Sequence, residues 1–283
     1  MSTATDIRRK IDSFEAMPVI CQQIIKNMNN PDVDFGTLAE KIKYDPGMTM
    51  NILKLANSAY FGISKRVESL QTAIVMLGMK KLFQVVVAQK TTKHMLARMD
   101  GYDLLPEELL KHAVWTAVAA EEFSRVLRIT TPELLFTAGL LHDIGKAVLD
   151  PFVAENRDAL MDNASRHDMT FDMLERNTLG MNHAEAGSEL LKRWHFPQEL
   201  EAVIRLHHEP ESAGEHRMIV TIVHLADMLA YSQGVGTGID GLKYRVSEEA
   251  THALGLKGRI VERVASQTLE KMTELEKTLA EMM

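Results

Sequence analysis

The sequence predicts an all-α protein. Apolar residues recur every three or four positions along almost the whole chain, whereas the apolar–polar alternation that is typical of strands is scarce. The 283 residues are enough for one large domain or two modest domains with cores of their own. Hydrophobic residues make up 46% and charged residues 25% of the chain, as in an ordinary soluble globular protein.

Two helix starts are expected early in the N-terminal half. Thr37 and Glu40 have the spacing of a capping box. Asp45 before Pro46 has the order of a cap followed by a first helical residue. We therefore expect one helix to begin near Thr37 and another at Pro46.

Glycines mark the ends of the next helices. The stretch after the second start should end at Gly62, and a helix that begins near Ser69 should end at Gly78. Gly, Asp and Pro then gather between residues 100 and 106, which indicates a junction. The sequence thus predicts two parts, residues 1–105 and residues 106–283.

Three helices stand out in the C-terminal half. Thr131 and Pro132 predict the start of a helix with an apolar face. The segment 218–230 is apolar nearly all round but too short to span a bilayer, which indicates a buried core helix. Residues 258–283 form an amphipathic last helix, for which docking on the core is favoured over the seam of a homodimer.

Charge and cysteine usage exclude several classes of protein. A formal net charge of −7 provides no general basic surface for direct binding of nucleic acid. The single cysteine, Cys21, excludes a disulfide framework and a Cys-rich zinc module, and it favours a reducing compartment. The N-terminus lacks the apolar core of a signal peptide, and no stretch approaches about 18 uninterrupted apolar residues. We expect a cytoplasmic protein that does not span a membrane.

A His–Asp doublet lies at the end of the helix that begins at Pro132. Adjacent helical residues point about 100° apart, so His142 and Asp143 alone do not define an ion site. Imidazole nitrogens and carboxylate oxygens suit Zn, Mn, Fe or Ni, and a carboxylate can bridge two ions. Asp143 is the natural bridge if other helices supply further ligands.

Further ligands are expected on later helices. His207 continues the apolar face of its helix, and His208 borders the same face. Asp227 lies in the apolar segment 218–230, where a buried carboxylate requires a metal, a cation or strong donors. His224, three residues earlier, is a candidate support for Asp227.

Four more residues are candidates with open roles. His112 lies in a helix with Glu108 four residues earlier on the same face, where the two could share an ion; Glu108 is equally interpretable as a surface carboxylate. His183 opens a helix. Lys146 is either a solvated helix-end cation stabilised by the helix dipole or a group that holds a substrate phosphate.

Other polar residues are interpreted as structural. A lone buried histidine is more often a core residue than a ligand, so His195, His216 and His252 are left out of the site. The glycines of residues 233–240 follow no strand and lack a GK[ST] signature, which favours a flexible turn over a phosphate cradle.

The order of the candidate ligands resembles that of an enzyme superfamily. The H…HD…D order of HD-superfamily metallophosphohydrolases is matched by His112, His142, Asp143 and Asp227. Additions that resemble the HD-GYP variant, whose members use two or three metals to hydrolyse cyclic dinucleotides, are Lys146, His183, His207 and His208. The chain departs from that variant after His208, because it lacks the DGxGYP sequence.

The N-terminal half is similar to the HDOD family. The resemblance runs over residues 11–90, and its more specific positions are Asp45-Pro46, Asn57-Ser58 and Leu77-Gly78. With the C-terminal motifs it covers most of the chain. It implies an HD-superfamily helical bundle preceded by an N-terminal helical subdomain. Many members have lost metal ligands and act as signalling outputs or scaffolds.

Three functions follow as hypotheses. We expect a bacterial signal-transduction output or scaffold that works through signalling protein partners and keeps two divalent transition-metal ions, Fe, Mn, Ni or Zn. The alternative is an active phosphohydrolase on a phosphate-containing small molecule, a nucleotide or a cyclic dinucleotide, in which bridged ions activate water and Lys146 steadies the phosphate beside Asp143. The third is a vestigial ligand set without metal.

Overall fold

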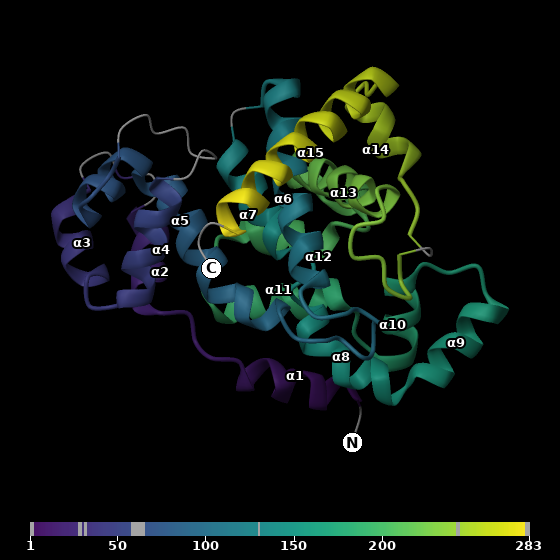
Figure 1. Ribbon diagram of the computed structural model, residues 1–283. Coiled ribbons are helices and arrows are strands. Elements are labelled where there is room, and N and C mark those ends of the chain that lie inside the picture. The colour runs from purple at the N-terminus through teal and green to yellow at the C-terminus, as the bar shows by residue number, and fades with distance from the viewer. Residues whose placement is uncertain are drawn as a thin grey trace. The chain divides into compact units, whose positions relative to one another are not determined.

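The computed structural model describes residues 3–27, 30, 33–57, 66–129, 131–241 and 244–280. The all-α prediction is confirmed: within these residues the regular structure is helical, and β structure is limited to one bridge between Met99 and Leu104 (Figure 1). The α-helices are α1 (Thr3–Ser13), α2 (Val19–Asn27), α3 (Phe35–Ile42), α4 (Pro46–Ala56), α5 (Leu70–Met95), α6 (Glu108–Leu127), α7 (Pro132–Leu141), α8 (Lys146–Glu155), α9 (Arg157–Arg166), α10 (Phe171–Leu179), α11 (His183–Arg193), α12 (Gln198–Leu206), α13 (Arg217–Ser232), α14 (Glu248–Ala253) and α15 (Gly258–Ala280). Two short 3-10 helices, η2 (Pro210–Ser212) and η3 (Gly214–His216), join α12 to α13.

Packing groups the chain into two compact units. The first unit comprises Met1–Ala16 and Thr92–Ala265, and the second comprises Met17–Thr91 and Ser266–Met283. The grouping differs from a single cut after residue 105, because α1 and the segment from Thr92 pack with the C-terminal half. As a statement about separate folding domains, the division at residue 105 stays a prediction.

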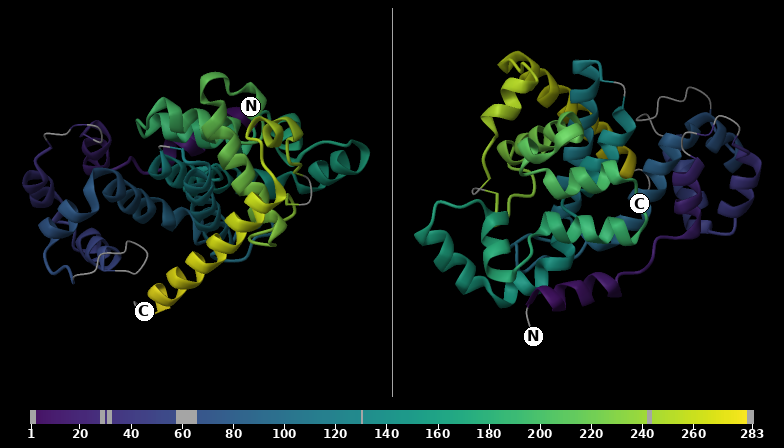
Figure 2. Two further views of the ribbon diagram at one scale, coloured as in Figure 1. Left: turned by 90° about the horizontal axis from the view of Figure 1, so that it is seen from above. Right: turned by 180° about the vertical axis from the view of Figure 1, so that it is seen from behind.

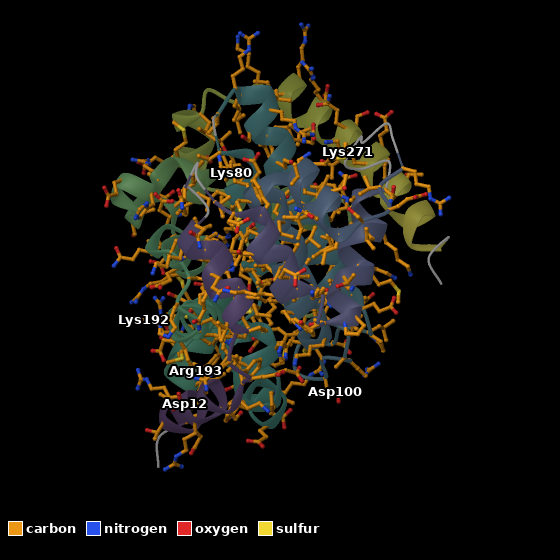
Figure 3. The ribbon with its side chains drawn as sticks, turned by 90° about the vertical axis from the view of Figure 1, so that its left-hand side faces the viewer. Asp12, Lys80, Asp100, Lys192, Arg193 and Lys271 are labelled. Carbon is orange, nitrogen blue, oxygen red and sulfur yellow. The ribbon has the colours of Figure 1, made fainter. Side chains whose placement is uncertain are left out.

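Polar contacts to the backbone fix α1 on the first unit. The Arg193 guanidinium of α11 donates to the carbonyl groups of Asp12 and Phe14 at 2.8 and 2.6 Å. The indole of Trp194 donates to the carbonyl of Glu15 at 3.0 Å. Asp12 and Arg193 lie beside each other (Figure 3), with the guanidinium 3.8 Å from the Asp12 carboxylate. These bonds explain why the first residues belong with a helix far along the chain.

The start of α3 in the second unit corrects one prediction. The Asp34 carboxylate accepts the backbone N–H of Gly36 at 2.9 Å and the Thr37 hydroxyl at 2.5 Å. Asp34 is therefore the N-cap, and the capping box predicted from Thr37 and Glu40 is wrong. A short acidic side chain immediately before the helix competes for the same free N–H groups and prevails.

Two other boundaries of the second unit are confirmed. The Asp45 carboxylate accepts the backbone N–H of Met48 at 2.9 Å, so α4 begins at Pro46 as predicted. Gly78 has a φ of 70° and a ψ of 171° inside α5, which divides that helix into two at the predicted end. The expected stop at Gly62 lies outside the described residues.

Helix α5 is long and apolar enough to cross a membrane, by length and composition only, with a mean hydropathy of 1.4 over its best window. However, 56% of that window is buried, and the kink at Gly78 interrupts the helix. A buried core helix passes the same test, so this is weak evidence for a membrane span.

Close helix packing in the first unit positions the candidate site. A Cβ atom on Gly139 of α7 would lie 2.7 Å from the Cα of Ala117 in α6. A Cβ atom on Gly145, just before α8, would lie 1.9 Å from the carbonyl oxygen of His183 in α11. Only glycine permits these approaches, which bring α6 to α7 and the turn before α8 to α11.

The predicted core helix and last helix are both present. Every residue of α13 from Val220 to Ala230 is buried, which confirms the prediction for the apolar segment. Val264 of α15 is fully buried, in agreement with docking on a core. Figure 2 shows α15 as one long helix. The side chains of Leu275 and Leu279, expected on its apolar face, lie outside the described side chains.

Candidate metal centre

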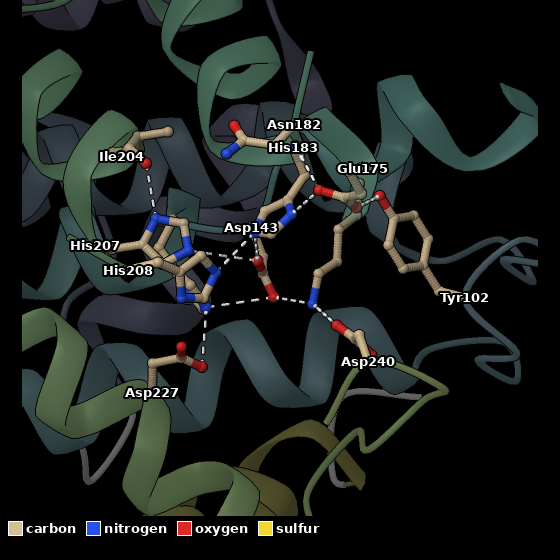
Figure 4. A network of polar contacts seen from close by, with 12 residues as sticks. Tyr102, Asp143, Glu175, Asn182, His183, Ile204, His207, His208, Asp227 and Asp240 are labelled. Atoms are coloured by element: carbon tan, nitrogen blue, oxygen red, sulfur yellow. Dashed lines mark hydrogen bonds and ion pairs between the residues drawn. The ribbon is translucent and has the colours of Figure 1, made fainter. Parts of the chain in front are cut away.

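The predicted ligands meet in the first unit at helix ends and inner helix faces. Five helices supply the ligands. His112 lies in α6, His183 in α11 and Asp227 in α13; His142 and Asp143 directly follow α7, and His207 and His208 directly follow α12. In Figure 4 the labelled members of this set point toward one another. Sequence analysis had these residues as ligands, and the fold brings them together.

Six of the seven residues form two groups of possible ligands. The first group is His112, His142 and Asp227, and the second is His183, His207 and His208. Within each group the candidate ligand atoms all lie within 4.8 Å of one another. Each group is therefore small enough to hold one ion.

Asp143 lies between the two groups. Its Oδ2 atom is 3.4 Å from Nε2 of His142 and 3.7 Å from Nε2 of His112. Its Oδ1 atom is 3.4 Å from Nε2 of His183 and 3.9 Å from Nε2 of His207. One oxygen thus faces each group, which is the arrangement expected of a carboxylate that bridges two ions.

Main-chain carbonyl groups orient three of the imidazoles. The Nδ1 atoms lie 2.7 to 2.8 Å from carbonyl oxygens in the pairs His112–Val235, His142–Gly139 and His207–Ile204. A carbonyl oxygen can only accept, so Nδ1 carries the proton in each ring. The Nε2 atoms of His142 and His207 have no hydrogen-bond partner among the described residues and could bind a metal, whereas Nε2 of His112 lies 2.9 Å from Oδ1 of Asp227.

Several inward-facing atoms are buried without a hydrogen-bond partner in the part of the chain that the structure describes. They are Nε2 of His142, Nε2 of His207, both carboxylate oxygens of Asp143, and Oδ2 of Asp227. Asp143 nevertheless has an ion-pair contact of 2.7 Å with Lys146, outside hydrogen-bond geometry. Buried polar atoms seldom stay unsatisfied, and divalent ions would satisfy this set. The residues therefore fit a metal.

Electrostatics keeps the acidic ligands charged. Burial alone raises the pKa of Asp143, but Lys146 and His142 outweigh it and hold that pKa well below the usual range. Burial likewise opposes the charge of Asp227, and the imidazoles of His142 and His112 keep its pKa well below the usual range. Both carboxylates are therefore anionic, which is the form that binds a cation.

The histidines differ among themselves. Burial lowers the pKa of His142, but the carboxylates of Asp143 and Asp227 outweigh burial and raise it to about 10. For His207, burial and the imidazoles of His142 and His183 lower the pKa to about 3. The imidazoles therefore respond to their nearest charges: the carboxylates raise the pKa of His142, whereas His207, among other imidazoles, stays neutral.

Lys146 is buried beside the centre. Its Nζ atom lies 2.7 Å from Oδ2 of Asp143 and 2.5 Å from Oδ2 of Asp240, and it donates to the Tyr231 hydroxyl at 2.9 Å. Only 1% of Lys146 is exposed, and it is the first residue of α8. The interpretation as a solvated cation stabilised by the helix dipole is therefore wrong, because the favourable end for a cation is the C-terminus. The role of holding a phosphate stays a prediction.

The glycine-containing segment 233–240 contributes to the centre, which sequence analysis missed. It supplies the carbonyl of Val235 to His112 and the carboxylate of Asp240 to Lys146. Asp240 is fully buried. The predicted turn is present at residues 233–236, but its contribution to the centre was not predicted, because no signal in the sequence distinguishes Asp240 from a surface acid.

Two open candidates are engaged elsewhere. The Glu108 carboxylate accepts the backbone N–H of Leu105 at 2.7 Å and belongs to neither group of ligands. His224 donates to the carbonyl of His207 at 2.8 Å and accepts from the backbone N–H of Ser247 at 3.0 Å. His224 therefore supports the backbone beside His207 rather than Asp227.

A capping box that sequence analysis missed sets the position of His183. The Asn182 side chain accepts the backbone N–H of Glu185 at 2.8 Å, and the Glu185 carboxylate accepts the backbone N–H of Asn182 at 3.1 Å. Helix α11 therefore begins at His183 itself. The N-x-x-E spacing is legible in the sequence and could have predicted this start.

Comparison with known proteins places the chain. A curated relative, an uncharacterised protein of Treponema pallidum (strain Nichols), is 24% identical over 226 residues, which are 80% of this chain and 44% of that protein. The chain thus spans less than half the length of this relative. It also resembles an HDOD domain protein of unknown function from Geobacter sulfurreducens, with a TM-score of 0.69, 22% identity, and coverage of 99% and 94% of the two chains.

Two further solved structures share the fold. A protein of Shewanella amazonensis SB2B, provisionally described as a phosphohydrolase, has a TM-score of 0.68 and 25% identity, over 95% of this chain and 97% of that one. A protein of Marinobacter aquaeolei VT8, provisionally described as a signal transduction protein, has a TM-score of 0.70 and 19% identity, over 98% of this chain and 65% of that one. The HDOD domain family model matches residues 15–210, which is most of the chain. The chain therefore belongs to the HDOD family.

Proposed function

We propose that this protein is a cytoplasmic signal-transduction output of the HDOD family that binds two divalent transition-metal ions and acts through protein partners. The observation that carries the metal proposal is the position of Asp143, with one oxygen toward each group of ligands. A set of imidazole nitrogens and carboxylate oxygens suits Fe, Mn, Ni or Zn. When bound, such ions polarise a phosphate ester and lower the pKa of bound water.

The side chains around the centre have separate tasks in this proposal. Asp143 and Asp227 supply negative charge, and the Nδ1 hydrogen bonds fix the direction of each imidazole. Burial excludes water: His112, His142, Asp143, His183, His207 and Asp227 are each at most 1% exposed. Ions held in this way would fasten the helices of the first unit to one another.

The closed geometry favours an output role over turnover. Lys146 is engaged by the carboxylates of Asp143 and Asp240, so a phosphate would have to displace Asp240 before it could reach Lys146. A centre that is buried, and whose lysine is already paired with two carboxylates, suits a structural metal site beneath a surface that binds partners. The likeness to the Marinobacter protein, provisionally described as a signal transduction protein, agrees with this proposal.

A specific observation supports the second candidate, a metal-dependent phosphohydrolase. A carboxylate placed to bridge two ions, with a lysine 2.7 Å away, would suit hydrolysis of a phosphate ester. In that case Asp143 and Lys146 are catalytic, and the substrate is a nucleotide or cyclic dinucleotide. The likeness to the Shewanella protein, provisionally described as a phosphohydrolase, points the same way.

Elemental analysis and an activity panel test the proposal together. Protein purified from metal-supplemented cells should contain about two transition-metal ions per chain, as judged by mass spectrometry of the elements. It should not turn over a panel of nucleotides and cyclic dinucleotides at a rate above that of the Asp143→Asn variant. Protein free of metal would support the vestigial ligand set instead.

The Asp143→Asn variant also separates the two functions in cells. It keeps the shape of the side chain but removes the bridging charge. If the protein is an output, the variant should restore signalling in a strain that lacks the gene, provided that its circular dichroism spectrum matches the wild type. Turnover of a phosphate ester that Asp143→Asn abolishes, with signalling lost in parallel, would establish the hydrolase.

A further inference from the structure

Glu175 of α10 is a buried carboxylate beside His183, at one end of the centre. Its Oε2 atom accepts Nδ1–H of His183 at 2.6 Å and the backbone N–H of His183 at 2.8 Å. Its Oε1 atom accepts the Tyr102 hydroxyl at 2.5 Å. Figure 4 shows Glu175 between Tyr102 and His183. Glu175 thus fixes both the ring and the backbone of His183.

The partner of His183 differs in kind from those of the other oriented imidazoles. His112, His142 and His207 each donate Nδ1–H to a neutral main-chain carbonyl. His183 donates to a carboxylate, which is a stronger acceptor and makes the ring a better electron donor to a metal. Among these four rings, only His183 has an Nδ1 partner whose charge a substitution can remove.

The local fold explains why Glu175 reaches His183. Gly180, with a φ of 77°, ends α10 in the left-handed conformation, and Asn182 caps α11 two residues later. This short turn brings Glu175, in the middle of α10, against the first residue of α11. The backbone N–H of His183 is one of the free donors at a helix start, and Glu175 satisfies it.

Tyr102 holds the carboxylate in place from the other side. Its side chain is fully buried and its ring lies 5.9 Å from that of Phe171, at the start of α10. Its carbonyl accepts the backbone N–H of Ile239 at 2.9 Å. The hydroxyl that bonds to Glu175 is therefore fixed by packing at both ends of the residue.

We propose that Glu175 is a positioning residue that holds His183 with Nδ1 protonated and Nε2 directed at the ion of the second group, His183, His207 and His208. Glu175 does not touch the ion in this proposal; it sets how tightly that ion binds. The inference rests on the proposed function, because it requires that the centre binds metal. Glu175 would thus set the affinity of one of the two ions independently of the other.

Metal titration of the Glu175→Gln variant tests the inference. The amide keeps the size of the side chain but removes its charge, so the affinity of one ion should fall about 10- to 100-fold while the other ion binds as in the wild type. Apo full-length protein is titrated with Mn(II), and stoichiometry and affinity are read from calorimetry. Electron paramagnetic resonance should show the spectrum of a coupled ion pair replaced by that of a single ion.

The same helix offers a matched control. Asp172 lies three residues before Glu175 and is 1% exposed, yet its carboxylate makes no hydrogen bond or ion pair with the histidines among the described residues. Asp172 interacts with the charge of His183 but does not hydrogen-bond its ring, so Asp172→Asn should weaken either ion far less than Glu175→Gln does. Glu175→Asp provides a second test variant, because it keeps the charge but withdraws it by one methylene and should weaken the same ion.

The outcomes distinguish the inference from the proposed function. Two ions of unchanged affinity in Glu175→Gln and Glu175→Asp would overturn the inference while leaving the metal centre intact. Loss of both ions together with a lowered melting temperature would overturn it as well, since that is the result of a merely structural role. Wild-type protein that binds no Mn(II) would overturn the proposed function, and the inference with it.

Discussion

At the scale of single residues, the centre shows how burial and charge compensate each other. Burial lowers the pKa of Lys146, but the carboxylates of Asp143 and Asp240 outweigh burial and raise that pKa. A buried ion pair repays its desolvation only when the geometry is good and the remaining donors are satisfied, and the Tyr231 hydroxyl contributes here. Asp240 therefore stabilises the charge of Lys146, which would otherwise have Asp143 as its one nearby carboxylate among the described residues.

His94 provides a pH dependence that is independent of the centre. Its ring lies 4.8 Å from that of Phe14 and 6.4 Å from that of Trp194. Burial, with help from Lys93, lowers its pKa from 6.5, and Glu15 opposes the shift only in part. The unfolded state therefore takes up a proton more readily than the folded state, so the stability present above pH 6.5 is lost as the pH falls from that value through the lower pKa of the folded state.

We expect His94→Phe to remove this loss. The phenyl ring keeps the contact with Phe14 but cannot be protonated. The free energy of unfolding is measured in urea for both proteins. The value for the variant minus that for the wild type should rise as the pH is lowered from about 7.5 to about 5.5, a range that spans the reference imidazole pKa. Both proteins are measured with saturating metal so that the centre cancels. A difference that is constant with pH contradicts the assignment.

At the scale of elements, the sequence analysis succeeded where one residue decides and failed where two compete. Pro46 with Asp45 before it, and Gly78, each determine a boundary alone, and both were predicted. At α3 two caps are available, and Asp34 prevails over Thr37 because its carboxylate reaches the Gly36 N–H. A local pattern shows that a helix begins in a given stretch, whereas the choice between two adjacent candidate caps depends on three-dimensional geometry.

The close approach of α8 and α11 gives a prediction for Gly145. In Gly145→Ala the new methyl group would lie 1.9 Å from the carbonyl oxygen of His183 and 2.6 Å from the backbone nitrogen of Gly187. Backbone atoms cannot turn aside as side chains can, so we expect a loss of about 3 kcal/mol in the free energy of unfolding, at the upper end for overpacking. Because Asp143 and His183 are pushed apart, metal affinity should fall as well.

A second glycine serves as the control for this prediction. A Cβ atom on Gly258, the first residue of α15, would meet nothing within 4 Å. Gly258→Ala should therefore leave the free energy of unfolding and the metal content close to those of the wild type. Equal stability of the Gly145→Ala and Gly258→Ala variants in urea would show that the approach of α8 to α11 is looser than described.

At the scale of the whole molecule, the centre depends on residues far apart in the chain. His112 and Asp227, which lie 2.9 Å apart, are separated by 115 positions. Residue type and order, together with the resemblance of the H…HD…D order to the HD superfamily, were enough to predict which side chains meet. Their division into two groups around Asp143 follows from helix packing and could not be predicted. Glu175 and Asp240 were missed because a lone acid in sequence gives no sign that it is buried.

Metal removal tests how the whole molecule depends on the centre. All the candidate ligands belong to the first unit, so chelation should lower the stability of that unit, by about 2.7 kcal/mol per ion when free metal is 100-fold above its dissociation constant. Hydrogen exchange with mass spectrometry should show faster exchange in α6, α11 and α13 after chelation. Helices α2, α3 and α4 belong to the second unit and should exchange as before.

The Asp143→Asn variant is the control for the same experiment, because without the bridging charge it should respond to the chelator far less than the wild type. Uniform acceleration across both units would mean that metal stabilises the chain as one cooperative body. No change in α6, α11 and α13 would mean that the ligands hold their positions without ions. Faster exchange after chelation that is confined to the first unit would instead show that the metal joins the helices of that unit. These helices carry ligands far apart in the chain: His112 and Asp227 are separated by 115 positions.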